Sequence, residues 1–199
     1  MKPTEMPALA KSINQEPNIY VRAAIWLYLL TGMRKIELLS AKWDWIDWER
    51  AEMRLPETKQ GKVHYVPLNK PARALLEQLP KEKNNVYIFP SRVNTGSHIV
   101  NIDKNWRKIR ERAKLTDVHL HDLRRTVGSW MASAGVPLKV IGSVLGHREL
   151  KTTEIYSRLA EDTGRKALES HGKEIGKLID DIDTGTLKDA NEPVDENAS

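Results

Sequence analysis

The sequence has no cysteine, no long hydrophobic run and no internal repeat. The lack of cysteine excludes disulfide bonds, thiolate zinc sites and a cysteine nucleophile. The longest uninterrupted apolar run, Ala23–Leu30, has eight residues, whereas a membrane-spanning helix needs about 20. Residues Met1–Ala10 carry Lys2, Glu5 and two prolines, without the apolar stretch of a secretory signal. We therefore expect a cytoplasmic protein that does not associate with membranes.

Positive charge is unevenly distributed along the 199 residues, which are enough for one domain with a real core. The first 160 residues contain 27 Lys and Arg against 16 Asp and Glu, a net charge of +11. Residues 161–199 contain 5 against 11, a net charge of −6. A strongly basic body with a separate acidic segment is typical of proteins that bind a polyanion, most often nucleic acid. Ordinary solubility is the alternative explanation of the same charges.

The hydrophobic pattern predicts an α+β domain, mainly α-helical, with a small antiparallel β-sheet. Asn18 is expected to cap a helix that ends at Gly32, and Asn69 to begin another that runs to Leu79. The sheet is expected over residues 43–55 and 63–68, with a hairpin near Gly61. Further helices are expected over residues 34–42, 100–115, 122–134, 137–145, 152–159 and 165–179.

Six polar side chains at the ends of these elements are candidates for chemistry: Arg34, Lys59, His121, Arg124, His147 and Tyr156. Each also has an ordinary explanation. Arg34 could form a surface ion pair with Glu37, Lys59 could be solvated at a hairpin tip, and His121 could cap a helix. His147 could simply follow a helix stop at Gly146, and Tyr156 could be a packing residue. Arg124 is expected to face solvent.

Considered together, these residues describe a site for a phosphodiester. The planar fork of arginine binds two non-bridging phosphate oxygens at once. The expected helix N-termini at His121 and Thr152 add backbone donors for an anion. The sequence has no carboxylate cluster for a metal, and the pair His119 and His121 lacks a third ligand.

The order and spacing of these residues resemble the catalytic domain of the tyrosine recombinases, the phage-integrase family, and above all the integrases of prophages and integrative islands. The resemblance covers about residues 18–160. The matching segments are Thr31–Leu38, Trp43–Asp47, Lys59 eight residues before Pro67, His121–Thr126, Leu145–His147 and Thr152–Tyr156.

The resemblance implies a site-specific DNA recombinase that cleaves and rejoins DNA through a 3′-phosphotyrosine, without metal, ATP or another cofactor. It implies that Tyr156 attacks the scissile phosphate and that Arg34 and Arg124 hold its oxygens. Lys59 would protonate the leaving 5′-oxygen, His121 would accept the tyrosine proton or orient the tyrosine, and His147 would donate a hydrogen bond to the phosphate. Glu37 would hold Arg34 or a histidine from behind.

The implied partner is double-stranded DNA, bound by a protein that is a monomer alone and a tetramer on paired DNA sites. Accessory DNA-bending proteins are a further possible partner. On this basis we divide the chain into a lead-in over residues 1–17 with one short helix, a catalytic domain over 18–179 and an acidic tail over 180–199 that we expect to be disordered. Family members also carry DNA-binding domains before the catalytic one. The given chain therefore either lacks them, which we expect, or is a minimal recombinase.

Two other functions fit part of the sequence. Residues Thr126–Leu145 read as helix, turn and helix, which would suit a non-catalytic helix-turn-helix regulator. Such a regulator would not need Tyr156, Lys59 or Arg34. A type IB topoisomerase would use the same chemistry to relax supercoils without a defined partner site, and a metal-dependent nuclease is a weaker alternative.

Overall fold

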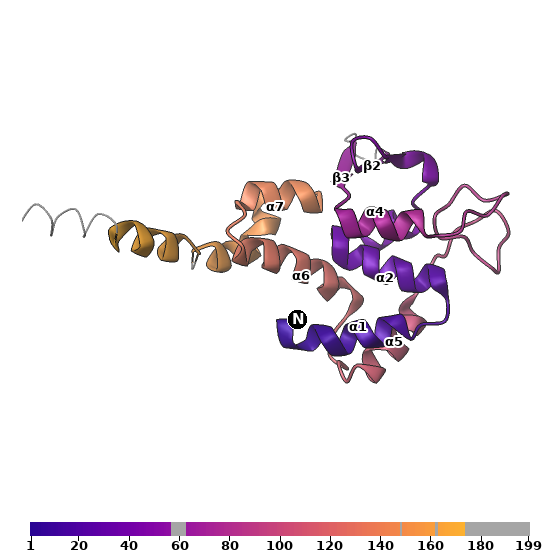
Figure 1. Cartoon of the computed structure of the whole chain (residues 1–199), viewed down its shortest axis with the longest axis horizontal. Coiled ribbons are helices and arrows are strands. Elements are labelled where there is room, and N and C mark those ends of the chain that lie inside the picture. Colours follow the sequence, from indigo (N-terminus) through magenta and orange to yellow (C-terminus); the bar gives the residue numbers. More distant parts are fainter. Residues whose placement is uncertain (57–62, 148, 162, 174–199) are drawn as a thin grey trace, which may run out of the picture.

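The computed structural model describes residues 1–56, 63–147, 149–161 and 163–173 of the chain (Figure 1). The α-helices within these ranges are α1 (Met6–Asn14), α2 (Ile19–Thr31), α3 (Lys35–Leu39), α4 (Lys70–Glu77), α5 (Asp103–Arg112), α6 (Leu120–Ser133) and α7 (Leu138–Leu145). The same ranges contain the 3-10 helices η1 (Pro3–Glu5), η2 (Trp43–Trp45) and η3 (Leu150–Tyr156), and the strands β1 (Ile46–Asp47), β2 (Glu52–Leu55) and β3 (His64–Pro67). None of the helices in this part of the chain has both the length and the apolar character to cross a membrane.

The three short strands form an antiparallel sheet in the order β1-β2-β3. The sequence predicts a small antiparallel sheet at this place. Met53 on β2 lies opposite Val66 on β3, and both side chains are buried. The sheet is smaller than expected at its beginning. Residues 43–45 alternate in hydrophobicity like a strand, but the amide of Trp45 donates to the carbonyl of Lys42 and closes a 3-10 turn. The mainly helical α+β class is confirmed.

Side-chain caps fix the beginnings of two helices where the sequence predicts them. Oδ1 of Asn18 accepts hydrogen bonds from the amides of Tyr20 and Val21, at 3.0 and 3.3 Å. Oδ1 of Asn69 accepts one from the amide of Ala72, at 3.0 Å. Each cap satisfies backbone donors that have no partner inside the helix. Both helices are therefore correctly predicted at their N-terminal ends.

Helix α1 lies in the segment that the sequence analysis treats as a lead-in. Its Leu9 and Ile13 are fully buried, and Oγ of Ser12 donates to the carbonyl of Ile109 on α5 at 2.7 Å. Figure 1 shows α1 and α5 side by side. Because these side chains recur at helical spacing and fill the core, α1 is a structural part of the domain.

The buried hydrophobic side chains form two clusters. The larger one contains side chains from each of the helices α1 through α5, from the sheet and from the first turns of α6, including Leu123. The smaller one, which we call the C-terminal cluster, consists of Ala132, Ile141, Leu145 and Tyr156. Helix α6 contributes to both, so it connects the two parts of the core.

Beyond η3, residues 157–161 and 163–173 are helical and extend away from the rest of the molecule, at the left of Figure 1. The sequence predicts an α-helix over residues 152–159, but the chain forms η3 up to Tyr156 and turns α-helical after it. Residues 174–179 of the last predicted helix, and the predicted acidic tail over 180–199, lie outside the described residues.

Candidate functional site

Four of the six candidate side chains line one cavity of about 690 Å³. They come from separate elements: Arg34 precedes α3, His121 and Arg124 lie on α6, and His147 follows α7. The rest of the lining consists of Tyr28, Lys35, Ile36, Glu37, Leu120 and Thr152. The juxtaposition predicted from the sequence is therefore present for these four residues.

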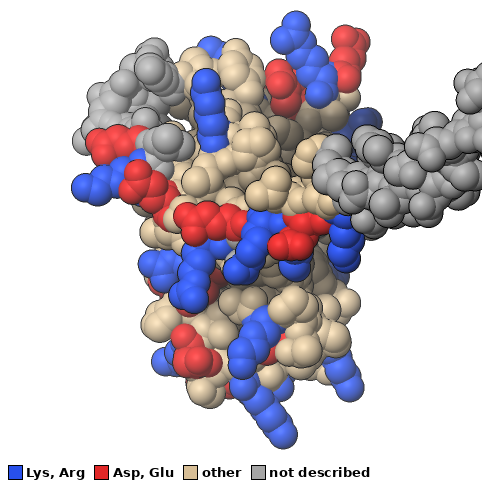
Figure 2. Space-filling view, turned by 90° about the vertical axis from the view of Figure 1, so that its left-hand side faces the viewer, with Lys and Arg blue, Asp and Glu red and all other residues tan. Residues whose placement is uncertain are grey.

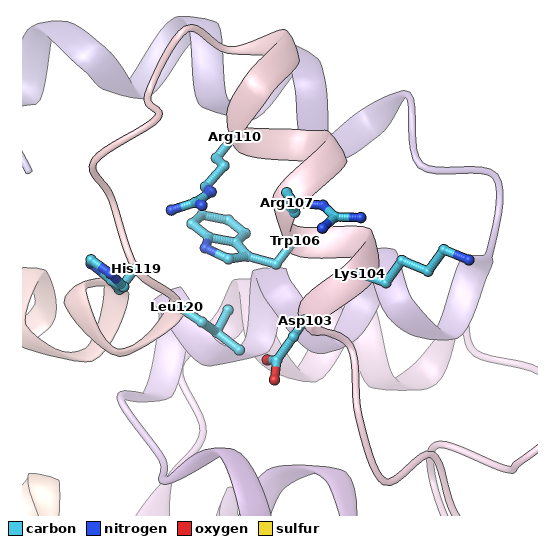
Figure 3. A pocket seen from close by; sticks show the side chains of 7 residues that line it. All are labelled: Asp103, Lys104, Trp106, Arg107, Arg110, His119 and Leu120. Atoms are coloured by element: carbon cyan, nitrogen blue, oxygen red, sulfur yellow. The ribbon is translucent and has the colours of Figure 1, made fainter.

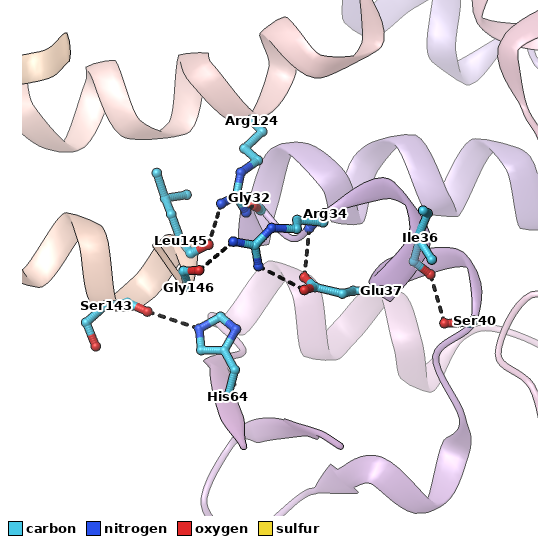
Figure 4. Close-up of polar contacts among 10 residues, drawn as sticks. All are labelled: Gly32, Arg34, Ile36, Glu37, Ser40, His64, Arg124, Ser143, Leu145 and Gly146. Carbon is cyan, nitrogen blue, oxygen red and sulfur yellow. Dashed lines mark hydrogen bonds and ion pairs between the residues drawn. The ribbon is translucent and has the colours of Figure 1, made fainter. Parts of the chain in front are cut away.

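Arg34 is held in place by its own helix and by the segment after α7. Its Nη1 donates to Oε1 of Glu37 at 2.9 Å, and its Nη2 donates to the carbonyl of Gly146 at 2.6 Å (Figure 4). Oε2 of Glu37 also accepts the backbone amide of Arg34, at 3.1 Å. A guanidinium carries five N–H groups in a fixed plane. The side chain, 43% exposed, thus keeps donors available to an anion in the cavity.

Arg124 is buried, which corrects the expectation that it faces solvent. Its Nη1 donates to the carbonyl of Gly32 and its Nη2 to the carbonyl of Leu145, both at 2.5 Å. These carbonyls end α2 and α7, where helices leave acceptors unpaired and carry partial negative charge. Burial, followed by the charge of Arg34, lowers the pKa of Arg124. The guanidinium nevertheless stays cationic at neutral pH.

The two histidines of the cavity are neutral at neutral pH. Burial lowers the pKa of His147 to about 4, with further lowering by Arg124, Arg34 and His121. Burial and the charges of Arg125 and Arg124 also lower the pKa of His121. A neutral imidazole offers one donor and one acceptor nitrogen, so either ring can exchange a proton with a bound group.

His121 does not cap α6. The cap is His119, whose backbone amide donates to Oδ2 of Asp122 at 2.8 Å. His121 lies in the first turn and lines the cavity instead. Among the residues that the structure describes, no group of three or more His, Cys, Asp or Glu side chains could hold a metal ion.

Tyr156 lies beside the cavity rather than in its lining. It is 4% exposed and belongs to the C-terminal cluster. Its ring packs on Gly128 of α6: a Cβ built on that glycine would lie 2.4 Å from Cζ and 2.6 Å from the hydroxyl oxygen. Burial raises the pKa of Tyr156, while the charges of Arg124 and Arg125 oppose the rise. The hydroxyl is thus near the cationic site but held against α6.

Lys59 lies in the connection between β2 and β3, outside the described residues. Two other polar side chains at the site escaped sequence reasoning. Oγ1 of Thr153, which is fully buried, lies 2.8 Å from Nδ1 of His147. His64 on β3 contacts the segment after α7. Thr153 could have been found from the sequence, because it lies in the segment Thr152–Tyr156 that resembles the family. His64 is a single histidine on a strand and has no such signal.

Replacing Gly128 by Ala is expected to displace the Tyr156 ring, because the new methyl group would overlap it. Overpacking of this kind costs about 1–3 kcal/mol of unfolding free energy. Nitration by tetranitromethane, followed by peptide mapping, should show faster modification of Tyr156. Gly164→Ala is the control, since a Cβ at Gly164 meets nothing within 4 Å. Unchanged stability and nitration in Gly128→Ala would contradict this packing.

Comparison with known proteins identifies the family to which the chain belongs. The family model described as "Phage integrase family" matches residues 1–163. The chain therefore belongs to the phage integrase family.

Relatives of this chain include a DNA recombinase and a phage integrase. A shufflon-specific DNA recombinase of Escherichia coli is 31% identical over 147 residues, which are 73% of this chain and 36% of the relative. The integrase of Salmonella phage P22 is 28% identical over 185 residues, 87% of this chain and 47% of the relative. The chain thus spans less than half the length of these two relatives.

Solved structures share the fold. The crystal structure of XerA recombinase matches with a TM-score of 0.70 at 22% identity, over 86% of this chain and 64% of that one. The catalytic domain of bacteriophage HP1 integrase matches with a TM-score of 0.65 at 19% identity, over 85% of this chain and 92% of that one. The fold described above is therefore that of a recombinase catalytic domain.

Proposed function

We propose that this chain is the catalytic part of a site-specific DNA recombinase, which cleaves and rejoins double-stranded DNA through a 3′-phosphotyrosine in integration or excision. One observation carries the proposal: the guanidinium groups of Arg34 and Arg124 bond the adjacent carbonyls of Gly146 and Leu145 and line one cavity with the imidazoles of His121 and His147. Membership of the phage integrase family supports the same reaction.

In this mechanism the cavity holds the scissile phosphate. Arg34 and Arg124 bond its non-bridging oxygens and oppose the negative charge that accumulates in the transition state. His147 donates a further hydrogen bond from the ring nitrogen that does not face Thr153. Glu37 keeps the Arg34 guanidinium oriented towards the phosphate.

The covalent step transfers the phosphate from DNA to protein. Tyr156 leaves its position on Gly128, its hydroxyl oxygen bonds the phosphorus, and the bond to the 5′-oxygen breaks. His121 accepts or directs the tyrosine proton, and Lys59 gives a proton to the leaving 5′-oxygen. Attack by a second 5′-hydroxyl reverses these transfers. The phosphotyrosine keeps the energy of the phosphodiester bond, so rejoining needs no ATP.

A second hollow supports DNA as the partner. It measures about 580 Å³ and is lined by Lys104, Arg107 and Arg110 of α5. In Figure 3 the guanidinium group of Arg110 lies over the indole ring of Trp106, and Arg107 points to the other side. Leu120 lines both this hollow and the cavity of the candidate site, so the two adjoin.

The charge of one face of the molecule agrees with this. Figure 2 shows Lys and Arg side chains over much of that face, most of them in its middle and lower parts, with Asp and Glu side chains among them. We propose that the DNA backbone follows the basic hollow into the site, with affinity that falls as salt rises. Assembly of four copies on paired DNA sites, and help from DNA-bending proteins, belong to the same proposal.

Trapping the covalent intermediate tests the function. The full chain is incubated in EDTA with labelled duplexes that carry a nick and a randomised sequence around it, so that cleavage near the nick releases a short 5′-hydroxyl fragment. We expect labelled DNA that stays attached in SDS, with the modified peptide containing Tyr156. No adduct across the pool, or attachment elsewhere, would reject the proposal. A requirement for magnesium would indicate a nuclease, and site-independent relaxation of supercoils would indicate a topoisomerase.

Filling the cavity with an anion is expected to raise the pKa of His147 above about 4, because an anion offsets the charges of Arg34 and Arg124. Titration of the imidazole signals by NMR, with and without inorganic sulfate, measures the change, and chloride at equal ionic strength is the control. In the folded protein without an anion, the pKa of His147 is lower than in the unfolded chain, where it is about 6.5. Stability from this residue is therefore complete above about pH 6.5 and is lost as pH falls towards 4, and sulfate should weaken that loss. An unchanged pKa in sulfate would contradict the anion site.

A further inference from the structure

His64 contacts the segment that holds both arginines. It is the first residue of β3, paired with Leu55 of β2. Its Nε2 lies 3.0 Å from the carbonyl of Ser143 in the last turn of α7. A carbonyl can only accept, so Nε2 carries the hydrogen and donates it. The same carbonyl also accepts the backbone amide of Gly146 at 3.0 Å, so His64 adds a second donor to a carbonyl at the C-terminal end of α7.

The same ring packs on Gly146. A Cβ at that position would lie 2.7 Å from both Cε1 and Nδ1 of His64. Gly146 also has a positive φ of 63°, which favours glycine. The backbone after α7 and the imidazole therefore approach one another more closely than any other residue at 146 would permit.

The backbone carbonyls of Gly146 and Leu145 accept hydrogen bonds from the two arginines of the cavity. The carbonyl of Gly146 accepts Nη2 of Arg34, and the carbonyl of Leu145 accepts Nη2 of Arg124. Figure 4 shows the His64 ring next to these carbonyls, reaching them from the sheet. Within the described residues, Nδ1 of His64 is buried without a hydrogen-bond partner, so the ring is fixed by Nε2 and by packing alone.

We propose that His64 is a positioning residue for the phosphate site: by bonding Ser143 and packing on Gly146, it fixes the Leu145–Gly146 carbonyls that orient Arg34 and Arg124. The sheet and the anion cavity are thereby connected through one imidazole. The inference rests on the proposed function for the identity of the natural anion, a DNA phosphate. The positioning itself concerns any tetrahedral anion in the cavity.

Binding of inorganic sulfate to the full chain, measured by calorimetry, tests the proposal. His64→Leu removes the donor and should weaken sulfate about three- to tenfold, the equivalent of one hydrogen bond. His64→Gln places an amide donor at a similar reach and should stay within about twofold of the original protein. Tyr65→Leu is the matched control, because Tyr65 is the next residue of β3 and is 49% exposed. Thermal unfolding of each variant verifies that it is folded.

If His64→Leu does not fold, the comparison of His64→Asn with His64→Gln tests the inference instead. The asparagine side chain is too short to reach Ser143, so the His64→Asn variant should bind sulfate more weakly than the His64→Gln variant. Equal sulfate affinity in folded Asn and Gln variants, or in His64→Leu and the original protein, would overturn the inference. Sulfate binding does not depend on DNA cleavage. A chain that never forms the DNA adduct but shows this order of affinities would reject only the proposed function, whereas a chain that binds no sulfate would reject both.

Discussion

Tyr156→Phe is expected to abolish the covalent protein–DNA adduct, with a loss of at least about 10³-fold that reflects removal of the nucleophile. The fold should survive, because the aromatic ring that fills the C-terminal cluster remains. Losing one hydroxyl changes the unfolding free energy by about 1 kcal/mol or less. SDS gels of the labelled nicked duplexes measure the adduct, and urea unfolding measures stability.

Binding of DNA by Tyr156→Phe should remain, because the arginines and the basic hollow are intact. Tyr65→Phe, a change at an exposed tyrosine of the sheet, is the control and should form adduct normally. An adduct that persists in Tyr156→Phe would show that another residue attacks the phosphate. If the protein were a regulator that only binds DNA, neither Tyr156→Phe nor Tyr65→Phe would form an adduct.

Arg124→Ala is expected to lose both adduct formation and stability. Removing the guanidinium leaves the carbonyls of Gly32 and Leu145 buried without their donor. Unpaired buried groups cost about 1–3 kcal/mol each, so the two carbonyls together predict a loss of about 2–6 kcal/mol in unfolding free energy. Urea unfolding checks this value, and the trapping assay checks the adduct.

The neighbouring arginine provides a matched control for that measurement. Arg125 has a side chain that is 61% exposed and pairs with Asp122 at 3.2 Å. An exposed ion pair contributes about 0–1 kcal/mol, so Arg125→Ala should change stability little. Equal stability of Arg124→Ala and Arg125→Ala would contradict the buried bonds described for Arg124.

Local signals in the sequence predicted much of this molecule. Asn18 and Asn69 mark helix starts because their side chains cap backbone amides within three residues. Alternation at Met53 and Leu55 marks a strand because one face of the sheet is buried. Such interactions depend on neighbours in the chain, so a single sequence reveals them.

What the sequence could not predict depends on distant backbone. Arg124 is buried because it donates to the backbone carbonyls at positions 32 and 145. Every residue type has a backbone carbonyl, so the sequence does not reveal which ones bind an arginine. His64 has the same kind of partner at Ser143. Leu9 and Ile13 have the right spacing for a core helix, but the prolines around them favoured a lead-in.

The C-terminal cluster is small, and Tyr156 is one of its four buried members. Withdrawing a side chain of this size from apolar surroundings costs about 2 kcal/mol, equivalent to a factor of about 30 in rate. An idle molecule of the proposed recombinase would therefore nick DNA rarely, since every attack must first overcome this internal penalty. Contacts made only on a correctly bound target would have to compensate for it, so the proposed recombinase would cleave random sequences more slowly than its target.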